Sequence, residues 1–143
     1  MAKTSPAPSG GGADSARPAP DAANPTTASG WTWVVEVGGA VVGFAASGAG
    51  HAESAPPPEG AGEVFAIYLA PEARGRGYGR TLFAHVVSDL QGRAFDPIVV
   101  WVFEANPVAR RFYEAAGFST DGARFTIDFD GSPIDEIRYR LDG

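Results

Sequence analysis

The sequence predicts an α/β protein built on one mixed sheet, and three patterns support this. Alternating apolar and polar residues, interrupted by a glycine pair, predict a hairpin between residues 31 and 46. Two apolar runs, at 63–69 and 98–103, predict buried strands, and each is followed by a segment with helical periodicity. Two further strand-like segments close the chain, so the expected order is strand, strand, strand, helix, strand, helix, strand, strand.

The first thirty residues lack the apolar side chains that a core requires. They contain no Val, Ile, Leu, Phe, Tyr or Trp and consist mostly of Ala, Pro, Gly, Ser and Thr. Such a segment cannot bury enough surface to offset the entropy lost on ordering. We therefore expect residues 1–30 to form a disordered tail and residues 31–143 to form one domain.

The hairpin is predicted from Trp31 to Val37, through a turn at Gly38 and Gly39, and back from about residue 40 to residue 46. Residues 48–62 contain four Gly, four Ala and three consecutive Pro, so a long surface loop is expected. His51 lies in this loop and is expected to be solvated.

The third strand is predicted at 63–69 (EVFAIYL), buried on both faces and ended by Pro71. A helix is predicted from about residue 77 to residue 90. His85 falls beside the buried face of this helix, where a surface position is the simpler interpretation. The residues of that face recur at spacings of three and four: Leu82, Phe83, Val86, Val87 and Leu90.

The fourth strand is predicted at 98–103 (IVVWVF). Asn106 and Pro107 then form a typical helix start, because the Asn side chain can cap the helix and Pro is tolerated at its first position. Gly117 is placed to end this second helix. Its predicted buried face is Val108, Phe112 and Ala115. Strands at about 124–129 and 134–140, joined by a turn at Asp130 and Gly131, complete the chain.

Composition excludes several classes of function. The 143 residues carry a formal net charge of −6, which argues against general nucleic-acid binding. The absence of cysteine excludes disulfides and a cysteine nucleophile, and with two histidines a metal centre is not expected. No apolar run approaches the roughly 18 residues of a membrane span, so we expect no membrane contact and a cytoplasmic protein.

The main functional signal is the segment RGRGYGR at residues 74–80, between the third strand and the first helix. Glycines there let the backbone approach a ligand closely, and a helix N-terminus offers unpaired amide groups to an anion. The segment lacks the Gly-Lys-Ser/Thr of a Walker loop, and its glycines are spaced two and two rather than as in a dinucleotide fingerprint. Taken alone, it is also compatible with an ordinary glycine-rich turn that carries solvated arginines.

Two ordered motifs resemble the Gcn5-related N-acetyltransferase (GNAT) superfamily. The acetyl-CoA signature of that family is matched by Arg74, Gly77 and Gly79, after the strand and proline IYLAP. The resemblance covers about residues 31–141. The second motif, an Asn, an aromatic pair and Gly-Phe, is matched by Asn106, Ala109, Phe112, Tyr113, Gly117 and Phe118.

The resemblance implies the acyl-CoA N-acyltransferase (GNAT) fold, a mixed and mostly antiparallel sheet with helices on both faces, here N-terminally incomplete. It further implies acetyl-CoA as co-substrate, bound through its pyrophosphate by the 74–80 loop and through its pantetheine arm by backbone groups near Tyr68 and Leu69. In the family the two central strands splay apart to admit the thioester. Asn106 would also hold the cofactor, although a purely structural role as a helix cap explains it equally well. The implied cofactor-binding residues are Tyr68, Leu69, Arg74, Gly75, Arg76, Gly77, Tyr78, Gly79, Arg80 and Asn106.

The resemblance also implies two catalytic residues. Glu63 falls where one branch of the family keeps its glutamate base, and Tyr113 resembles the family's general acid. Either side chain has a structural alternative, because Glu63 can be a solvated carboxylate at a strand end and Tyr113 can pack its ring in the core. Glu72 and Glu104 are weaker candidates for the base.

The family's first strand and two helices, which supply much of the acceptor pocket, have no counterpart in the tail. The strand at 31–37 is therefore expected to have an unpaired edge. A homodimer through this edge is one way to complete the sheet. Three functions stay open: an N-acetyltransferase acting on an amine of a small molecule or a protein, a non-catalytic acyl-CoA-binding module, and a truncated domain completed by a partner. Neither the acceptor nor the acyl chain length follows from the sequence.

Overall fold

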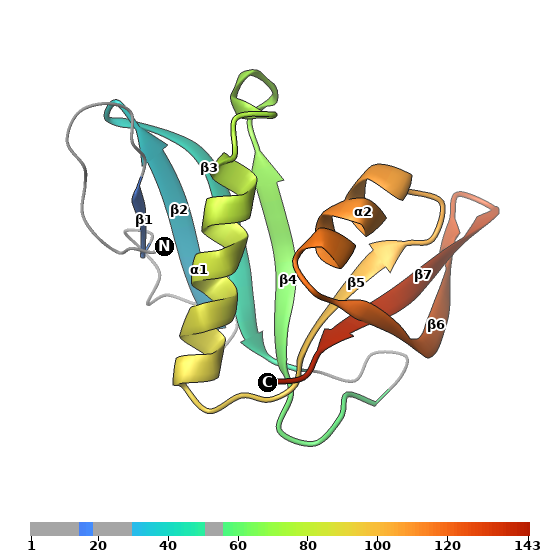
Figure 1. Cartoon of the computed structure of the whole chain (residues 1–143). Helices are drawn as coiled ribbons and strands as arrows, with labels where there is room; N and C mark the ends of the chain where they lie inside the picture. Colours follow the sequence, from blue (N-terminus) through green and yellow to red (C-terminus); the bar gives the residue numbers. More distant parts are fainter. Residues whose placement is uncertain (1–14, 19–29, 51–55) are drawn as a thin grey trace.

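A computed structural model describes residues 15–18, 30–50 and 56–143 (Figure 1). Within these residues no helix is both long and apolar enough to cross a membrane. The strands and helices, in chain order, are β1 (Ser15–Pro18), β2 (Gly30–Val37), β3 (Ala40–Ala49), β4 (Gly62–Leu69), a short 3-10 helix (Pro71–Ala73), α1 (Tyr78–Gly92), β5 (Ile98–Phe103), α2 (Pro107–Ala115), β6 (Ser119–Phe129) and β7 (Ser132–Leu141).

The strands form one sheet in the order β1-β2-β3-β4-β5-β7-β6. Only β4 and β5 pair in parallel; the other neighbouring strands in this order are antiparallel. The expected mixed, mostly antiparallel sheet is therefore confirmed, as is the order of the elements from residue 31 onwards.

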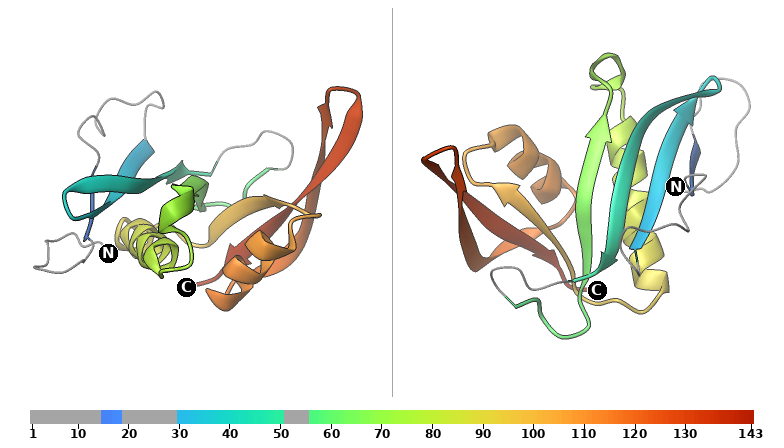
Figure 2. Two further views of the ribbon diagram at one scale, coloured as in Figure 1. Left: turned by 90° about the horizontal axis from the view of Figure 1, so that it is seen from above. Right: turned by 180° about the vertical axis from the view of Figure 1, so that it is seen from behind.

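Both helices lie on the same face of the sheet, which corrects the expectation of helices on both faces (Figure 2). The reason is the connectivity. The chain crosses from β4 through α1 to β5, and then from β5 through α2 to the parallel strand β6, moving along the sheet in one direction. Since such crossovers are right-handed, both connections place their helix on one side. In the described part of the chain, no helix covers the opposite face, which we call the open face.

The core lies between the sheet and the two helices. The predicted face of α1 is confirmed, with Leu82, Phe83 and Leu90 almost fully buried. The predicted face of α2 is confirmed only at Phe112, which packs against the core: Val108 is 68% exposed, Ala115 is exposed, and the buried residue is Tyr113. The ring of Tyr113 contacts those of Phe83, Phe118 and Tyr139, so this aromatic residue rather than Val108 faces the core.

The structure places a strand, β1, inside the segment expected to be a disordered tail. Its backbone pairs with β2 in the antiparallel direction along residues 33–36 of β2, so the edge expected to be unpaired has a partner strand there. Residues 1–14 and 19–29 of the tail, and the loop residue His51, lie outside the described residues.

Strand β4 is buried along only half of its length. Glu63 and Val64 are buried, whereas Phe65 is 36% and Tyr68 47% exposed, so the prediction of burial on both faces fails for the second half. The cause is the loss of its neighbour: β4 pairs with β5 over residues 62–64 and 98–100, and not beyond. The two central strands therefore diverge from Phe65 onwards.

Candidate active site

The divergence of β4 and β5 opens a gap in the middle of the sheet. On its other side β4 stays paired with β3 as far as Leu69, and β5 stays paired with β7 as far as Phe103. Each strand thus keeps its outer neighbour in the sheet, while β4 and β5 stop pairing with each other. Beyond residues 64 and 100 the two edges no longer pair with each other, so an extended ligand can lie between them.

The glycine-rich loop lies directly after β4, at the N-terminus of α1. Gly75 has a φ of 78° and Gly77 a φ of 88°, values that favour glycine, and no atom lies within 4 Å of a Cβ built on either residue. Gly77 is the N-cap of α1 and offers no side chain to the first amide groups of the helix. The loop therefore presents unpaired amides and open space to an anion, which is the chemistry that a pyrophosphate requires.

Gly79 serves the packing of this loop. A Cβ on Gly79 would lie 3.1 Å from Cδ1 of Leu69 and 3.7 Å from a ring atom of Phe112. The absence of a side chain thus lets α1 begin close to the end of β4. Gly79 thus fixes the position of the loop, whereas the surface at Gly75 and Gly77 is open.

The three arginines of the loop are exposed. Arg74 donates from Nε to the carbonyl oxygen of Leu69, at 3.3 Å, and so ties the loop back to β4. Arg80 also lines a groove of about 490 Å³ between α1 and α2, together with Phe83 and Arg111. Positive side chains are thus gathered around one helix N-terminus in a chain whose net charge is −6.

Tyr68 and Leu69 occupy the end of β4 beside the gap, as the resemblance implies for residues whose backbone meets the pantetheine arm. Leu69 packs against the core, while the side chain of Tyr68 is on the open face. Tyr78, the remaining residue of the expected set, begins α1 and is partly buried against the core.

Asn106 caps helix α2. Its Oδ1 accepts a hydrogen bond from the amide of Ala109 at 3.1 Å, and Pro107 takes the first helical position, as predicted. The structural role of Asn106 is therefore present in the structure, and its role toward the cofactor stays a prediction.

Tyr113 lies on α2 within an aromatic cluster. Its ring centroid is 5.3 Å from that of Phe83, 5.4 Å from that of Phe112 and 6.2 Å from that of Tyr139. Burial raises the pKa of the Tyr113 hydroxyl, so the group stays protonated at neutral pH. Although the side chain is only 7% exposed, its hydroxyl has no hydrogen-bond partner among the described residues.

Glu63 is 5% exposed, so its carboxyl does not lie in bulk solvent as a strand-end residue would. It pairs across the sheet with Gly48 on β3 and Val99 on β5. Because Val64 points into the core, Glu63 belongs to the open face, two residues before the strands diverge.

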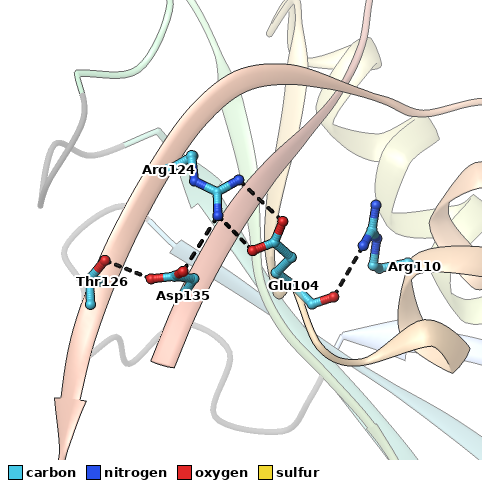
Figure 3. A network of polar contacts seen from close by, with 5 residues as sticks. All are labelled: Glu104, Arg110, Arg124, Thr126 and Asp135. Atoms are coloured by element: carbon cyan, nitrogen blue, oxygen red, sulfur yellow. Dashed lines mark hydrogen bonds and ion pairs between the residues drawn. The ribbon is translucent and has the colours of Figure 1, made fainter. Parts of the chain in front are cut away.

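Of the two weaker candidates for the base, Glu104 is held in a surface network (Figure 3). Its Oε1 lies 2.6 Å from a guanidinium nitrogen of Arg124, which also reaches Asp135 at 3.4 Å. The hydrogen bond from Arg124 lowers the pKa of Glu104, which makes this carboxylate a weaker proton acceptor. Glu72 is exposed, in the 3-10 helix after β4.

The sequence did not reveal a polar cluster that anchors α2. The hydroxyl of Tyr139 donates to Glu114 at 2.7 Å and accepts from Nε of Arg110 at 3.0 Å, and Arg110 also donates to the carbonyl oxygen of Glu104 at 3.1 Å. Arg110 and Glu114 lie four residues apart on α2. Their function depends on Tyr139, which is remote in sequence, so no local pattern could have indicated it.

Comparison with known proteins agrees with this geometry. The model of the acetyltransferase (GNAT) family matches residues 10–118. A mycothiol acetyltransferase of Thermobispora bispora is 35% identical over 96 residues, which cover 67% of this chain and 31% of that protein. The chain thus spans about a third of the length of that relative.

Solved structures share the fold. The IAA acetyltransferase of Bacillus cereus superposes with a TM-score of 0.70 at 19% identity, covering 92% of this chain and all of the other. YncA of Salmonella typhimurium, in a structure with its cofactor acetyl-CoA, gives a TM-score of 0.67 at 21% identity over 79% of this chain and 64% of the other. The chain belongs to the acetyltransferase (GNAT) family.

Proposed function

We propose that this chain transfers an acetyl group from acetyl-CoA to a primary amine by direct attack within a ternary complex. The observation that carries the proposal is the coincidence of two features on β4: the glycine loop at its end and the loss of its partner strand two residues after Glu63. An anion site and an opening for an extended thioester arm thus share one strand.

The residues fit acetyl-CoA in charge and shape. The free amides at the start of α1 suit the pyrophosphate, and Arg76 and Arg80 add positive potential beside them. The edge of β4 near Tyr68 and Leu69, which no longer pairs with β5, suits the amide groups of the pantetheine arm. When bound, the cofactor supplies an activated acetyl group as a thioester.

Glu63 is the proposed base. An alkylamine of pKa about 10.4 is mostly protonated at pH 7.4, and holding it neutral costs roughly 4 kcal/mol at 1.36 kcal/mol per pH unit. A carboxylate on the open face, close to where β4 and β5 part, can take this proton directly or through water.

Tyr113 is the proposed acid. It lies on α2 with its ring beside Tyr139 of β7, and its hydroxyl is protonated at neutral pH, so it can give a proton to the departing thiolate. The relatives named mycothiol acetyltransferase make thiol-containing amines reasonable members of any acceptor panel.

The test is release of free CoA from acetyl-CoA by the purified full chain, over a panel of amines that includes monoamines, polyamines, amino acids and peptides. We expect amine-dependent release, and a rise in melting temperature with acetyl-CoA. Stabilisation without release for every amine would reject the transferase and favour a binding module. Absence of both effects would reject the cofactor assignment as well.

A further inference from the structure

The open face of the sheet carries exposed aromatic side chains on both sides of the gap between β4 and β5. Each is between 36% and 47% exposed. Exposed aromatic groups of this number on one face are a feature of binding surfaces. We call them the aromatic rim; they are Phe44, Phe65, Tyr68, Phe103 and Phe125.

Strand pairing places these residues. Phe44 pairs with Tyr68 across β3 and β4, and their ring centroids are 5.9 Å apart. On the other side of the gap, Phe103 of β5 and Phe125 of β6 both pair with Glu136 of β7. Directly paired residues share a face of the sheet.

The face itself follows from the core. Ala45, Val102 and Ile137 are buried in the core beneath the helices. Since side chains alternate along a strand, the neighbouring residues Phe44, Phe103 and Glu136 point to the open face. Strand β4 has a bulge here, so Phe65 and Ala66 both oppose Ala46, which follows the buried Ala45 and belongs to the open face.

An acceptor can approach the gap from this face. The helices α1 and α2 cover the other face, and the glycine loop that suits the pyrophosphate begins α1 on that covered side (Figure 2). A thioester reaching into the gap from the loop would therefore meet its amine from the open face, which also carries Glu63.

The charge of this face favours a cation. Glu136 lies between Phe103 and Phe125 in the ladder and adds a carboxylate to the rim, and Arg138, two residues along β7, is paired with Asp121 at 2.7 Å. Aromatic faces also attract a cationic amine through their quadrupole, most strongly where water is excluded. No lysine occurs after residue 30.

We propose that the aromatic rim binds the acceptor, and that the acceptor is an amine carried on an aromatic or other flat apolar body. This inference rests on the proposed function and names the substrate class of the same site. The rings hold the body of the acceptor by stacking, while Glu136 and Glu63 attract its ammonium group toward the gap.

The test compares 2-phenylethylamine with ethylamine and spermidine in the CoA-release assay. We expect kcat/KM for 2-phenylethylamine to exceed that for ethylamine by at least about tenfold, because ring contacts of 1.4 kcal/mol correspond to a factor of ten. Phe103→Leu and Phe125→Leu each lower kcat/KM for 2-phenylethylamine by about fivefold or more through KM, and change ethylamine by less than about twofold. Affinity for acetyl-CoA is unchanged in both variants.

Phe129→Leu is the matched control, because Phe129 is on the same strand as Phe125 and is 55% exposed, but lies four residues further toward the β6–β7 turn. It should leave all three amines unaffected. Equal use of the three amines, or rim variants that behave like Phe129→Leu, overturns the inference while the transferase stands. A dimer in size-exclusion chromatography that Phe103→Leu converts to a monomer also overturns it, because the face then belongs to a second copy.

Discussion

At the scale of single residues, two buried tyrosines differ in their proposed roles: Tyr113 is the proposed acid, and Tyr139 has a structural role. Tyr113 and Tyr139 lie with ring centroids 6.2 Å apart, and burial raises the pKa of both hydroxyls. The hydroxyl of Tyr139 is fully engaged with Glu114 and Arg110, whereas that of Tyr113 has no partner among the described residues. Only Tyr113 therefore has a proton to offer a substrate.

Tyr113→Phe keeps the ring in the aromatic cluster and removes the hydroxyl. We expect kcat to fall by at least about tenfold, with little change in melting temperature, because the ring rather than the hydroxyl makes the core contacts. Stopped assays at saturating acetyl-CoA measure the first, and thermal melts the second.

Tyr139→Phe is the converse control. It removes the hydroxyl that bonds both Arg110 and Glu114 and should lower the free energy of unfolding by about 1–3 kcal/mol.

An unchanged kcat in Tyr113→Phe would show that Tyr113 is a core residue and no acid.

Residue roles were predictable where a local rule decides them. The cap at Asn106 follows from the Asn-Pro pair, and the end of α2 before Gly117, which has a φ of 97°, follows from that glycine. The roles of Arg110 and Glu114 depend on Tyr139, a distant residue in another strand, and no local pattern carries that information.

At the scale of elements, the N-terminus of α1 is the proposed anion site. Arg76→Gln and Arg80→Gln should each weaken binding of acetyl-CoA by about fivefold to tenfold, an effect that shrinks at high salt because exposed charges are screened. Isothermal titration at low and high salt measures both effects.

Arg93→Gln is the control, because Arg93 follows the C-terminus of the same helix and pairs with Asp89 at 3.0 Å. Its loss should leave the affinity for acetyl-CoA as in the unaltered chain. Equal losses from all three substitutions would mean that only the overall charge matters.

The pairing of Glu104 with Arg124 ties the end of β5 to β6 and predicts a dependence of stability on pH. The folded-state pKa of Glu104 is lowered, chiefly by the hydrogen bond from Arg124, so the unfolded chain takes up this proton first as the pH falls. The stabilisation is therefore complete above about pH 4.3, the ordinary pKa of a glutamate, and is lost on further acidification.

Glu104→Gln should accordingly melt at a lower temperature than the unaltered chain at pH 7, and the difference should narrow toward pH 3. Thermal melts of both proteins over this range provide the measurement. A difference that stays constant with pH would show that the carboxylate charge contributes nothing.

For helix α2 and strand β4, the sequence predicted the position along the chain better than the burial of individual residues. Periodicity placed both correctly along the chain, yet it gave only one correct residue, Phe112, for the buried face of α2 and too much burial for β4. Burial depends on residues that are distant in sequence. Tyr113 is buried because its ring packs against Tyr139 and Phe118, and Tyr68 is exposed where β5 no longer pairs with β4.

At the scale of the whole molecule, one sheet separates two functions. The covered face carries the helices and the glycine loop, and the open face carries Glu63 and the aromatic rim. Counting strands and helices could not predict this separation. It follows from two crossovers that step along the sheet in one direction, which only the strand order reveals.

The central claim is that the glycine loop at the start of α1 binds acetyl-CoA. The chain contains a matched pair of glycines for this test: Gly77 in the loop has a φ of 88°, Gly39 in the β2–β3 turn has a φ of 86°, and neither has an atom within 4 Å of an added Cβ. Gly77→Ala and Gly39→Ala should therefore cost similar stability, about 1–2 kcal/mol each.

Titration of both variants with acetyl-CoA is the most direct measurement. We expect Gly77→Ala to weaken binding by at least about tenfold, because its methyl group occupies the space meant for the pyrophosphate and strains the loop, whereas Gly39→Ala binds like the unaltered chain. Equal affinity of the two variants for acetyl-CoA would contradict the account.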